Sequence, residues 1–332
     1  MSDVRVGIVG AGVIAHRHAG VLAGFPDVDV LAVADPNLER AEELAVRLGA
    51  AAYGSHLDML DAEGLDALYI CVPPFAHGPP ERAAIDAGLP FFVEKPLAVD
   101  LVTAEAIAIA VADHGLVTAA GYQWRYLDNV ERAQELLAGN PARLALTYWL
   151  DAVPPPPWWV HRSLSGGQIV EQATHALDLA RVLVGEATFV QAVSARTERA
   201  AFPRADVDDV AAATLRFQTG AVGSISSTCL LGWKHRAGIH LICQGMVIEL
   251  SEPEMAVHLG NGPVVYRAQA DTKVLVDRDF IDAVQGRPNR IRVPYQEALR
   301  THRLACALVQ SAEEGRPVEL PGRAPGGSEE PW

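Results

Sequence analysis

The first 35 residues constrain the fold of this chain more than any other stretch. An apolar run at 4–9 leads into the sequence GAGVIA, which begins at Gly10, and a second apolar run at 28–34 ends in Asp35. The glycine pattern is the G-x-G-x-x-A form of the dinucleotide fingerprint, in which a buried strand turns sharply into a helix. This order of strand, turn, helix, strand and acid predicts a Rossmann-type βαβ unit.

Each small residue of the turn has a physical task. Gly10 permits the tight turn from strand to helix, and Gly12 lets the backbone come close to a pyrophosphate. The helix that starts at Val13 and Ile14 offers unpaired N–H groups and the positive end of its dipole to phosphates. We therefore expect Gly10, Gly12, Val13 and Ile14 to bind a dinucleotide; the alternative is a glycine-rich turn without a ligand.

Asp35 indicates which dinucleotide is bound. It lies 25 positions after Gly10, near the spacing of the carboxylate that accepts hydrogen bonds from an adenosine ribose. A carboxylate repels a 2′-phosphate, and the next residues, Pro36 and Asn37, supply no arginine. We predict NAD as the cofactor, with NADP as the weaker alternative.

Composition and charge exclude several classes of partner. The chain has 332 residues, half of them hydrophobic, which is enough for two domains with sizeable cores. Its formal charge of −14 argues against nucleic acid and anionic membranes, which require a basic surface. No apolar run reaches the roughly 18 residues of a membrane span.

The cysteines indicate a reducing compartment. The four cysteines are scattered, without a C-x-x-C pair or the histidine spacing of a zinc site, so we predict neither a disulfide framework nor a metal. The start of the chain runs directly into the first strand and leaves no room for a signal peptide. These features predict a cytoplasmic protein.

Residues 1–121 alternate apolar runs with helical patterns, which predicts a doubly wound parallel sheet. Asp100 is expected to cap a helix that runs to about His114. Strands are expected at 4–9, 28–34, 66–72, 90–93 and 116–120, with a further helix at 38–48.

The pattern changes after Gly121, where strand-like segments follow one another directly. This predicts an α+β domain at 122–320 with a large, mainly antiparallel sheet, which we expect to bind substrate and to form subunit contacts. Residues 321–332 are expected to be a disordered tail. Strands are expected at 143–150, 190–196, 209–217, 221–229 and 240–249, and helices near 126–138, 167–184, 272–285 and 295–314.

Two groups of residues carry candidate chemistry. Lys95, in the tripeptide Glu94-Lys95-Pro96, follows a predicted strand, and its ammonium could hold a substrate oxygen and stabilise an alkoxide. His175 lies four positions after Glu171 on a predicted helix, and a histidine titrates near neutrality, which suits it to remove a hydroxyl proton. Taken singly, each is compatible with a solvated or structural side chain.

Together these groups resemble the Gfo/Idh/MocA family of oxidoreductases. The resemblance extends nearly end to end, and it implies hydride transfer between a nicotinamide and a sugar, cyclitol or similar polyol. It is carried by the fingerprint, by Glu94-Lys95-Pro96, by GYQWRY at 121–126, by Gly166-Gly167 before His175, and by the closing segment at 307–318.

The resemblance assigns roles to individual residues. It implies that Lys95 and His175 are catalytic, and that Glu171 stands where the family usually has an aspartate. Whether Glu171 contacts substrate, orients His175 or does neither is left open. The resemblance places these residues beside the cofactor: Val72, Pro73, His77, Glu94, Lys95 and Gln123. A helix-capping role is the alternative for His77, and the histidines of the first helix, His16 and His18, are expected at the surface or in packing.

Four further residues are candidates for the substrate pocket. Arg125 follows the strand expected at 116–120 and is expected to meet substrate, or to pair with a carboxylate between the domains. Gln172 adds polarity to the helix of His175. A stiff run of four prolines precedes Trp158 and Trp159, and an aromatic face suits the C–H face of a sugar ring. We expect Trp158, rather than Trp159, to line the pocket.

These expectations combine into one function with named alternatives. We predict an NAD(H)-dependent oxidoreductase that acts on a secondary hydroxyl or ketone of a sugar, cyclitol or related polyol, as a homodimer or homotetramer. The alternatives are a non-catalytic dinucleotide or sugar sensor on the same scaffold, and a reductase of a non-sugar substrate.

Overall fold

The computed structural model describes residues 3–322, which form two units. The first unit runs to Gln123 and also contains Asp271–Leu299, whereas the second contains Trp124–Ala270 and the described residues of 300–322. The sequence had assigned all of 122–320 to one domain. The segment 271–299 instead groups with the first unit, where Asp277 bonds to His18 of the first helix. Of the expected tail, residues 323–332 lie outside the described residues.

A sheet of six parallel strands forms the centre of the first unit, in the order β3-β2-β1-β4-β5-β6. The strands are buried and therefore consist of nearly continuous apolar runs. This confirms the predicted Rossmann sheet. Its strands are β1 (Val4–Val9), β2 (Val28–Ala34), β3 (Ala51–Tyr53), β4 (Ala67–Ile70), β5 (Phe91–Val93) and β6 (Thr118–Ala120).

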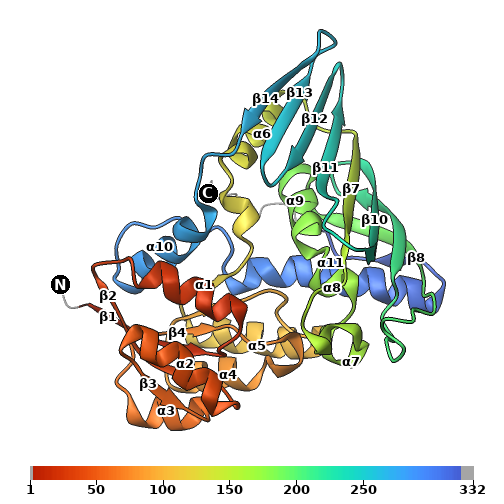
Figure 1. The fold of residues 1–332 in the computed structure, drawn as a ribbon. Coiled ribbons are helices and arrows are strands. Elements are labelled where there is room, and N and C mark those ends of the chain that lie inside the picture. Colours follow the sequence, from red (N-terminus) through yellow and green to blue (C-terminus); the bar gives the residue numbers. More distant parts are fainter. Residues whose placement is uncertain (1–2, 323–332) are drawn as a thin grey trace. The chain divides into compact units, whose positions relative to one another are not determined.

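The helices of this unit connect or follow these strands (Figure 1). Asp100 accepts a hydrogen bond from the Thr103 backbone N–H, which confirms the predicted cap. The 3₁₀ turn η1 (Pro74–Ala76) follows β4. The helices are α1 (Val13–Leu22), α2 (Leu38–Leu48), α3 (His56–Ala62), α4 (Pro79–Asp86), α5 (Leu101–His114) and α10 (Thr272–Val284).

A nine-stranded sheet forms the second unit, in the order β14-β13-β12-β11-β7-β10-β9-β8-β15. Neighbouring strands are antiparallel, except that β7 and β10 run parallel, so the predicted mainly antiparallel sheet is confirmed. Its strands are β7 (Leu144–Ala152), β8 (Ala187–Ala195), β9 (Val210–Phe217), β10 (Val222–Leu231), β11 (Arg236–Cys243), β12 (Met246–Ser251), β13 (Glu254–His258), β14 (Pro263–Arg267) and β15 (Val318–Glu319).

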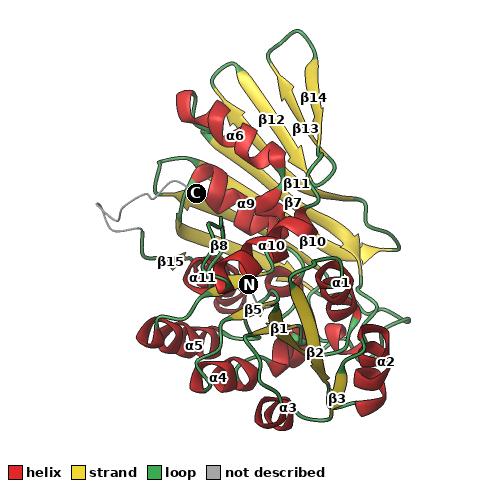
Figure 2. Ribbon diagram, turned by 90° about the vertical axis from the view of Figure 1, so that its left-hand side faces the viewer, coloured by secondary structure: helices red, strands yellow, loops and turns green. Residues whose placement is uncertain are grey.

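Helices cover one face of this sheet, as Figure 2 shows for α6 and α9. The long helix α11 begins within the first unit and continues in the second. The 3₁₀ turn η2 (Gln123–Tyr126) also includes the boundary between the units. The remaining elements are α6 (Asp128–Gly139), η3 (Pro157–Val160), α7 (Arg162–Ser165), α8 (Gln168–Glu171), α9 (Thr174–Val184) and α11 (Tyr295–Glu314).

Two predicted elements are divided in the structure. The single strand expected at 240–249 is a hairpin of β11 and β12, because Gly245 adopts a positive φ of 68° that turns the chain back. The single helix expected at 167–184 is interrupted between α8 and α9. The Ala173 N–H bonds to the Gln168 carbonyl five residues earlier, which breaks the regular α-helical hydrogen-bond pattern.

Candidate active site

The glycine-rich turn connects β1 to α1 at the carboxyl edge of the parallel sheet. Gly10 has a φ of +93°, and a Cβ atom there would lie only 2.4 Å from the carbonyl oxygen of Cys71. A Cβ at Gly12, by contrast, would meet no atom within 4 Å. Gly10 is therefore required by the fold itself, whereas Gly12 keeps the surface of the turn open toward a ligand.

The first turn of α1 has the exposed backbone that phosphate binding requires. Gly12 is its N-cap and offers no side chain to pair with the first N–H groups. The side chains of Val13 and Ile14 are 85% and 39% exposed, so they leave the start of the helix uncovered by the core. These features fit a helix start that binds the pyrophosphate of a dinucleotide.

Asp35, at the end of β2, is bonded directly to this turn. Its Oδ2 atom accepts a hydrogen bond of 2.8 Å from the Ala11 N–H, and its Oδ1 accepts one of 2.8 Å from the Asn37 N–H. A carboxylate has about four acceptor positions, so both oxygens keep capacity for ribose hydroxyls. The residues present in the turn therefore fit NAD.

The residues after β4 lie beside the same turn. The Val72 Cγ1 atom is 3.5 Å from the position that a Gly10 Cβ would take. Pro73 precedes η1, and His77 follows it as a buried residue. The His77 Nδ1 atom is 2.6 Å from Glu81 Oε1, so the ring is held by the first turn of α4. Gln123, half-buried, opens η2 after β6.

Glu94 and Lys95 follow β5 at the carboxyl edge of the sheet. The Glu94 carboxylate is buried and bonded to two side chains of α1: Oε1 lies 2.5 Å from Arg17 Nη2 and 3.0 Å from His18 Nε2. Burial raises the pKa of Glu94, but the charge of Arg17 and the bond to His18 outweigh burial and lower this pKa to about 2. The carboxylate therefore stays ionised, and Lys95 comes next in the chain at the sheet edge.

In the second unit, His175 lies in the first turn of α9 and is 5% exposed. Its imidazole stacks on the indoles of Trp124 and Trp149, with ring centroids 5.5 and 6.1 Å apart and interplanar angles of 23° and 24°. The Lys234 Nζ atom lies 5.2 Å from the Trp149 centroid. Trp149 and Lys234 were not predicted, because the run Tyr148-Trp149-Leu150 has no alternation of polar and apolar residues that would single out Trp149.

Glu171 and His175 do not share one continuous helix. Glu171 ends α8, and its Oε2 atom accepts a hydrogen bond of 2.6 Å from the Trp159 indole N–H. Gln172, between the helices, donates to the Ala152 carbonyl at 3.0 Å and accepts from Gln168 at 3.0 Å. The carboxylate at position 171 therefore orients an indole.

The two neighbouring tryptophans of η3 differ in burial. Trp159 is fully buried and packs with Val207 and Cys229, whereas Trp158 is only partly buried. Trp158 packs against the same cluster but keeps part of its surface exposed, so its contact with a ligand stays a prediction.

Arg125 is buried in an ion pair inside the second unit. Its Nε and Nη2 atoms each lie 2.7 Å from an oxygen of Asp178, and Thr301 donates to the same carboxylate at 2.6 Å. Burial raises the pKa of Asp178, but the charge and hydrogen bonds of Arg125 outweigh it and lower that pKa. Arg125 thus pairs with a carboxylate, as the alternative expected, but the carboxylate belongs to its own unit and does not lie between domains. The pair ties η2 to α9, the helix of His175.

Two sequence models of one protein family match consecutive parts of the chain. The model described as an oxidoreductase family with an NAD-binding Rossmann fold matches residues 4–122, and the model of the GFO/IDH/MocA C-terminal domain matches residues 131–248. The chain belongs to the GFO/IDH/MocA family of oxidoreductases. NAD is accordingly its cofactor, as Asp35 predicted.

The chain is also similar to individual oxidoreductases. The chain is 29% identical to the uncharacterized oxidoreductase YrbE of Bacillus subtilis (strain 168), over 96% of this chain and 97% of that protein. It is 28% identical to the scyllo-inositol 2-dehydrogenase (NAD⁺) of the same organism, over 68% and 67%. A levoglucosan dehydrogenase solved in complex with NADH has the same fold, with a TM-score of 0.85, 22% identity, and coverage of 97% and 100%.

Residues 3–322 contain no group of three histidine, cysteine, aspartate or glutamate side chains arranged to hold a metal ion. Within the same range, no helix combines the length and apolarity that a membrane span would require.

Proposed function

We propose that the protein transfers hydride between NAD and a secondary hydroxyl or ketone of a cyclic polyol, sugar or cyclitol. Bound NAD⁺ supplies the hydride acceptor, and NADH the donor in the reverse direction. The observation that carries the proposal is the position of Lys95: it follows β5 at the carboxyl edge of the sheet whose β1 end forms the dinucleotide turn. Ligands of open α/β sheets bind along that edge.

Lys95 and His175 divide the chemistry of the substrate oxygen. The Lys95 ammonium donates a charged hydrogen bond to the oxygen and stabilises negative charge that develops on it. The His175 imidazole accepts the hydroxyl proton during oxidation and returns it during reduction. Lys95 belongs to the first unit and His175 to the second, so their joint action on one oxygen is part of the proposal.

The stacking of His175 supports its role as a base. An imidazole that accepts a proton becomes a cation, and a cation beside the faces of Trp124 and Trp149 is favoured by their ring quadrupoles. The two indoles also fix the plane of the imidazole, so that the proton is taken from a defined direction. Trp124 and Trp149 are therefore proposed as orienting residues.

The remaining site residues extend the proposal. We assign NAD binding to Gly10, Gly12, Val13, Ile14 and Asp35, flanked by Val72, Pro73, His77 and Gln123. We assign substrate contacts to Trp158 and Gln172. Arg125 acts through the Asp178 pair that fixes α9, and Glu171 through the orientation of Trp159.

The names of the relatives favour a ring-shaped polyol. A scyllo-inositol dehydrogenase and a levoglucosan dehydrogenase both act, by name, on compounds with secondary hydroxyls on a ring. The partly buried Trp158 provides an aromatic face that suits the C–H face of such a ring.

A spectrophotometric panel tests this function. The purified protein is incubated with NAD⁺ and one of a series of inositols, hexoses and anhydrosugars, and the absorbance of NADH is followed at about 340 nm. At least one ring polyol is expected to be oxidised, and NADP⁺ should support a much lower rate. Tight NAD binding without turnover on any compound, in either direction, would contradict the proposal.

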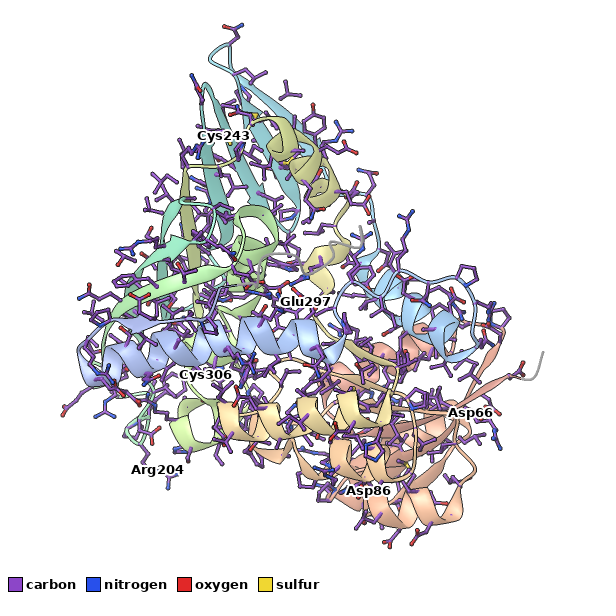
Figure 3. The ribbon with its side chains drawn as sticks, turned by 180° about the vertical axis from the view of Figure 1, so that it is seen from behind. Asp66, Asp86, Arg204, Cys243, Glu297 and Cys306 are labelled. Carbon is purple, nitrogen blue, oxygen red and sulfur yellow. The ribbon has the colours of Figure 1, made fainter. Side chains whose placement is uncertain are left out.

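We also propose a homodimer or homotetramer in the cytoplasm. The outer face of the nine-stranded sheet exposes Leu146, Val193, Val222 and Leu230, an apolar set that favours a self-association surface. The four cysteines are free thiols; Figure 3 labels Cys243 on β11 and Cys306 on α11. Free thiols are typical of a reducing compartment. Light scattering after size-exclusion chromatography measures the assembly, and a monomer would contradict it.

A further inference from the structure

A cluster of four charged side chains, three of them buried and Arg17 half-buried, lies behind the end of β5 in the first unit. Arg17 and His18 come from α1, Glu94 follows β5, and Asp277 comes from α10. His18 lies between two carboxylates, with Nε2 3.0 Å from Glu94 Oε1 and Nδ1 2.7 Å from Asp277 Oδ1. The reaction proposed above uses none of these four side chains directly.

The two neighbouring carboxylates favour the doubly protonated form of His18. A carboxylate oxygen accepts hydrogen bonds and does not donate them, so a proton on each ring nitrogen suits one carboxylate on each side. Arg17 Nη2 lies 2.9 Å from His18 Nε2, and both atoms are within hydrogen-bond distance of the same Glu94 oxygen. Burial lowers the pKa of His18, but the charges and hydrogen bonds of Asp277 and Glu94 outweigh it and raise the pKa to about 9.

The remaining surroundings of His18 are aromatic. Its ring lies 4.9 Å from the Phe92 ring and 5.3 Å from the Tyr69 ring, measured between centroids. Tyr69 and Phe92 belong to β4 and β5, so the imidazolium is enclosed between the sheet and the two helices α1 and α10. No solvent reaches this ring, which is 0% exposed.

The Glu94 carboxylate connects Arg17 and His18 to the backbone of Lys95. Its Oε1 atom bonds to both Arg17 and His18 of α1, while its Oε2 atom accepts a hydrogen bond of 3.1 Å from the Lys95 backbone N–H. The carboxylate also lies closely against Gly121, where a Cβ would come within 2.5 Å of it. The backbone of Lys95 is thus bonded, through one buried carboxylate, to the helix that begins at the dinucleotide turn.

We infer that Arg17 and His18 are positioning residues for Lys95: by holding Glu94 they fix the lysine backbone relative to α1 and its bound dinucleotide. Asp277 completes the arrangement by holding the far side of His18. The inference rests on the proposed function, in which the Lys95 ammonium contacts the substrate oxygen. A displacement of about 1 Å at such a group lowers turnover by up to about 100-fold.

Three variants test the inference in the full-length protein: His18→Gln, Asp277→Asn and Lys95→Ala. Asp66→Asn is the matched control, because Asp66 pairs with Arg5 at an exposed position on the amino side of the same sheet. For each protein, kcat, KM, the Kd for NAD, the far-UV circular dichroism spectrum and the pH dependence of kcat are measured.

We expect His18→Gln and Asp277→Asn to lower kcat about 10- to 100-fold, with a folded spectrum and an NAD Kd within about threefold of the natural protein. Turnover should fall at alkaline pH as His18 loses its proton and its hold on Glu94. In Asp277→Asn this fall should begin at a lower pH, because His18 then keeps only one carboxylate. Asp66→Asn should change neither kcat nor the pH profile. If His18→Gln does not fold, Asp277→Asn carries the test.

The outcomes separate the inference from the proposed function. If Lys95→Ala is inactive but His18→Gln and Asp277→Asn keep kcat and the pH profile of the natural protein, the positioning inference is overturned and the proposed function stands. A drop in melting temperature alone, without a change in kcat, also overturns it, since it would mark a purely structural cluster. Turnover that survives Lys95→Ala overturns both.

Discussion

Trp159 donates its indole N–H to the Oε2 atom of Glu171 over 2.6 Å, and this carboxylate closes α8. The indole is fully buried, and the nitrogen is its only polar atom. The bond therefore gives the Glu171 carboxylate a structural partner, the indole N–H of Trp159.

Removal of this carboxylate should destabilise the fold more than it slows the reaction. Glu171→Ala leaves a buried N–H without its partner and is expected to lower the free energy of unfolding by about 1–3 kcal/mol. Glu171→Gln keeps an acceptor oxygen and should cost less. Urea denaturation measures both, and equal midpoints for Glu171→Ala and the natural protein would contradict this role.

Alanine variants at Gly10 and Gly12 should have different effects: the first on stability and the second on NAD binding. Gly10→Ala would place a Cβ 2.4 Å from the Cys71 carbonyl oxygen at a positive φ, so we expect a marked loss of thermal stability. Gly12→Ala meets no protein atom and should keep the melting temperature, but it should weaken NAD binding because the added methyl group occupies the pyrophosphate surface. Melting curves and NAD titrations decide; a Gly12→Ala protein with unchanged NAD affinity would refute the assigned surface.

Asp35 should set the preference for NAD over NADP. Asp35→Asn keeps an acceptor toward the Ala11 or Asn37 N–H but removes the charge that repels a 2′-phosphate. We expect the ratio of kcat/KM for NAD to that for NADP to fall by about 10-fold or more, equivalent to roughly 1.4 kcal/mol. An unchanged ratio would indicate that another residue discriminates between the cofactors.

The sequence predicted the fold and the cofactor turn because both depend on local patterns. Buried parallel strands are continuous apolar runs, and the turn at Gly10 and Gly12 has a fixed spacing, so the Rossmann sheet and NAD could be derived directly. The break between α8 and α9 could not, because it depends on a hydrogen bond from Ala173 to Gln168 that no residue pattern announces.

Long-range pairing explains the other differences. His18 was expected at the surface or in packing, and it is buried, but its bond to Asp277, 259 positions later, could not be predicted from local sequence. The packing of α10 beside α1 also explains why 271–299 belongs to the first unit. Trp149 was missed as a neighbour of His175 because the register of β7 beneath α9 is a tertiary feature.

The cluster around His18 predicts a specific pH dependence of stability. The pKa of His18 is raised from 6.5 to about 9 in the folded protein, so its contribution is fully present below pH 6.5 and is lost as the pH rises to about 9. The loss is on the order of 3 kcal/mol, at about 1.4 kcal/mol per unit. Glu94, with its pKa lowered to about 2, acts in the opposite direction: its contribution is present above about pH 4.5 and is lost as the pH falls toward 2.

Unfolding by urea between pH 6 and 9.5 measures this dependence. The natural protein should lose stability steadily from pH 6.5 upward, and Asp277→Asn should show a shallower decline because its His18 pKa is less raised. Parallel declines in the two proteins would show that His18 is not the titrating group.

The central claim is that Lys95 and His175 perform the chemistry while NAD binds independently of both side chains. The most direct measurement compares single-turnover NADH formation and NAD affinity in Lys95→Ala, His175→Ala and the exposed control Lys273→Ala, using the best polyol of the panel. The account predicts a loss of about two to four powers of ten in rate for the first two, normal NAD binding in all three, and normal turnover for the control. Near-normal turnover in both Lys95→Ala and His175→Ala would contradict it.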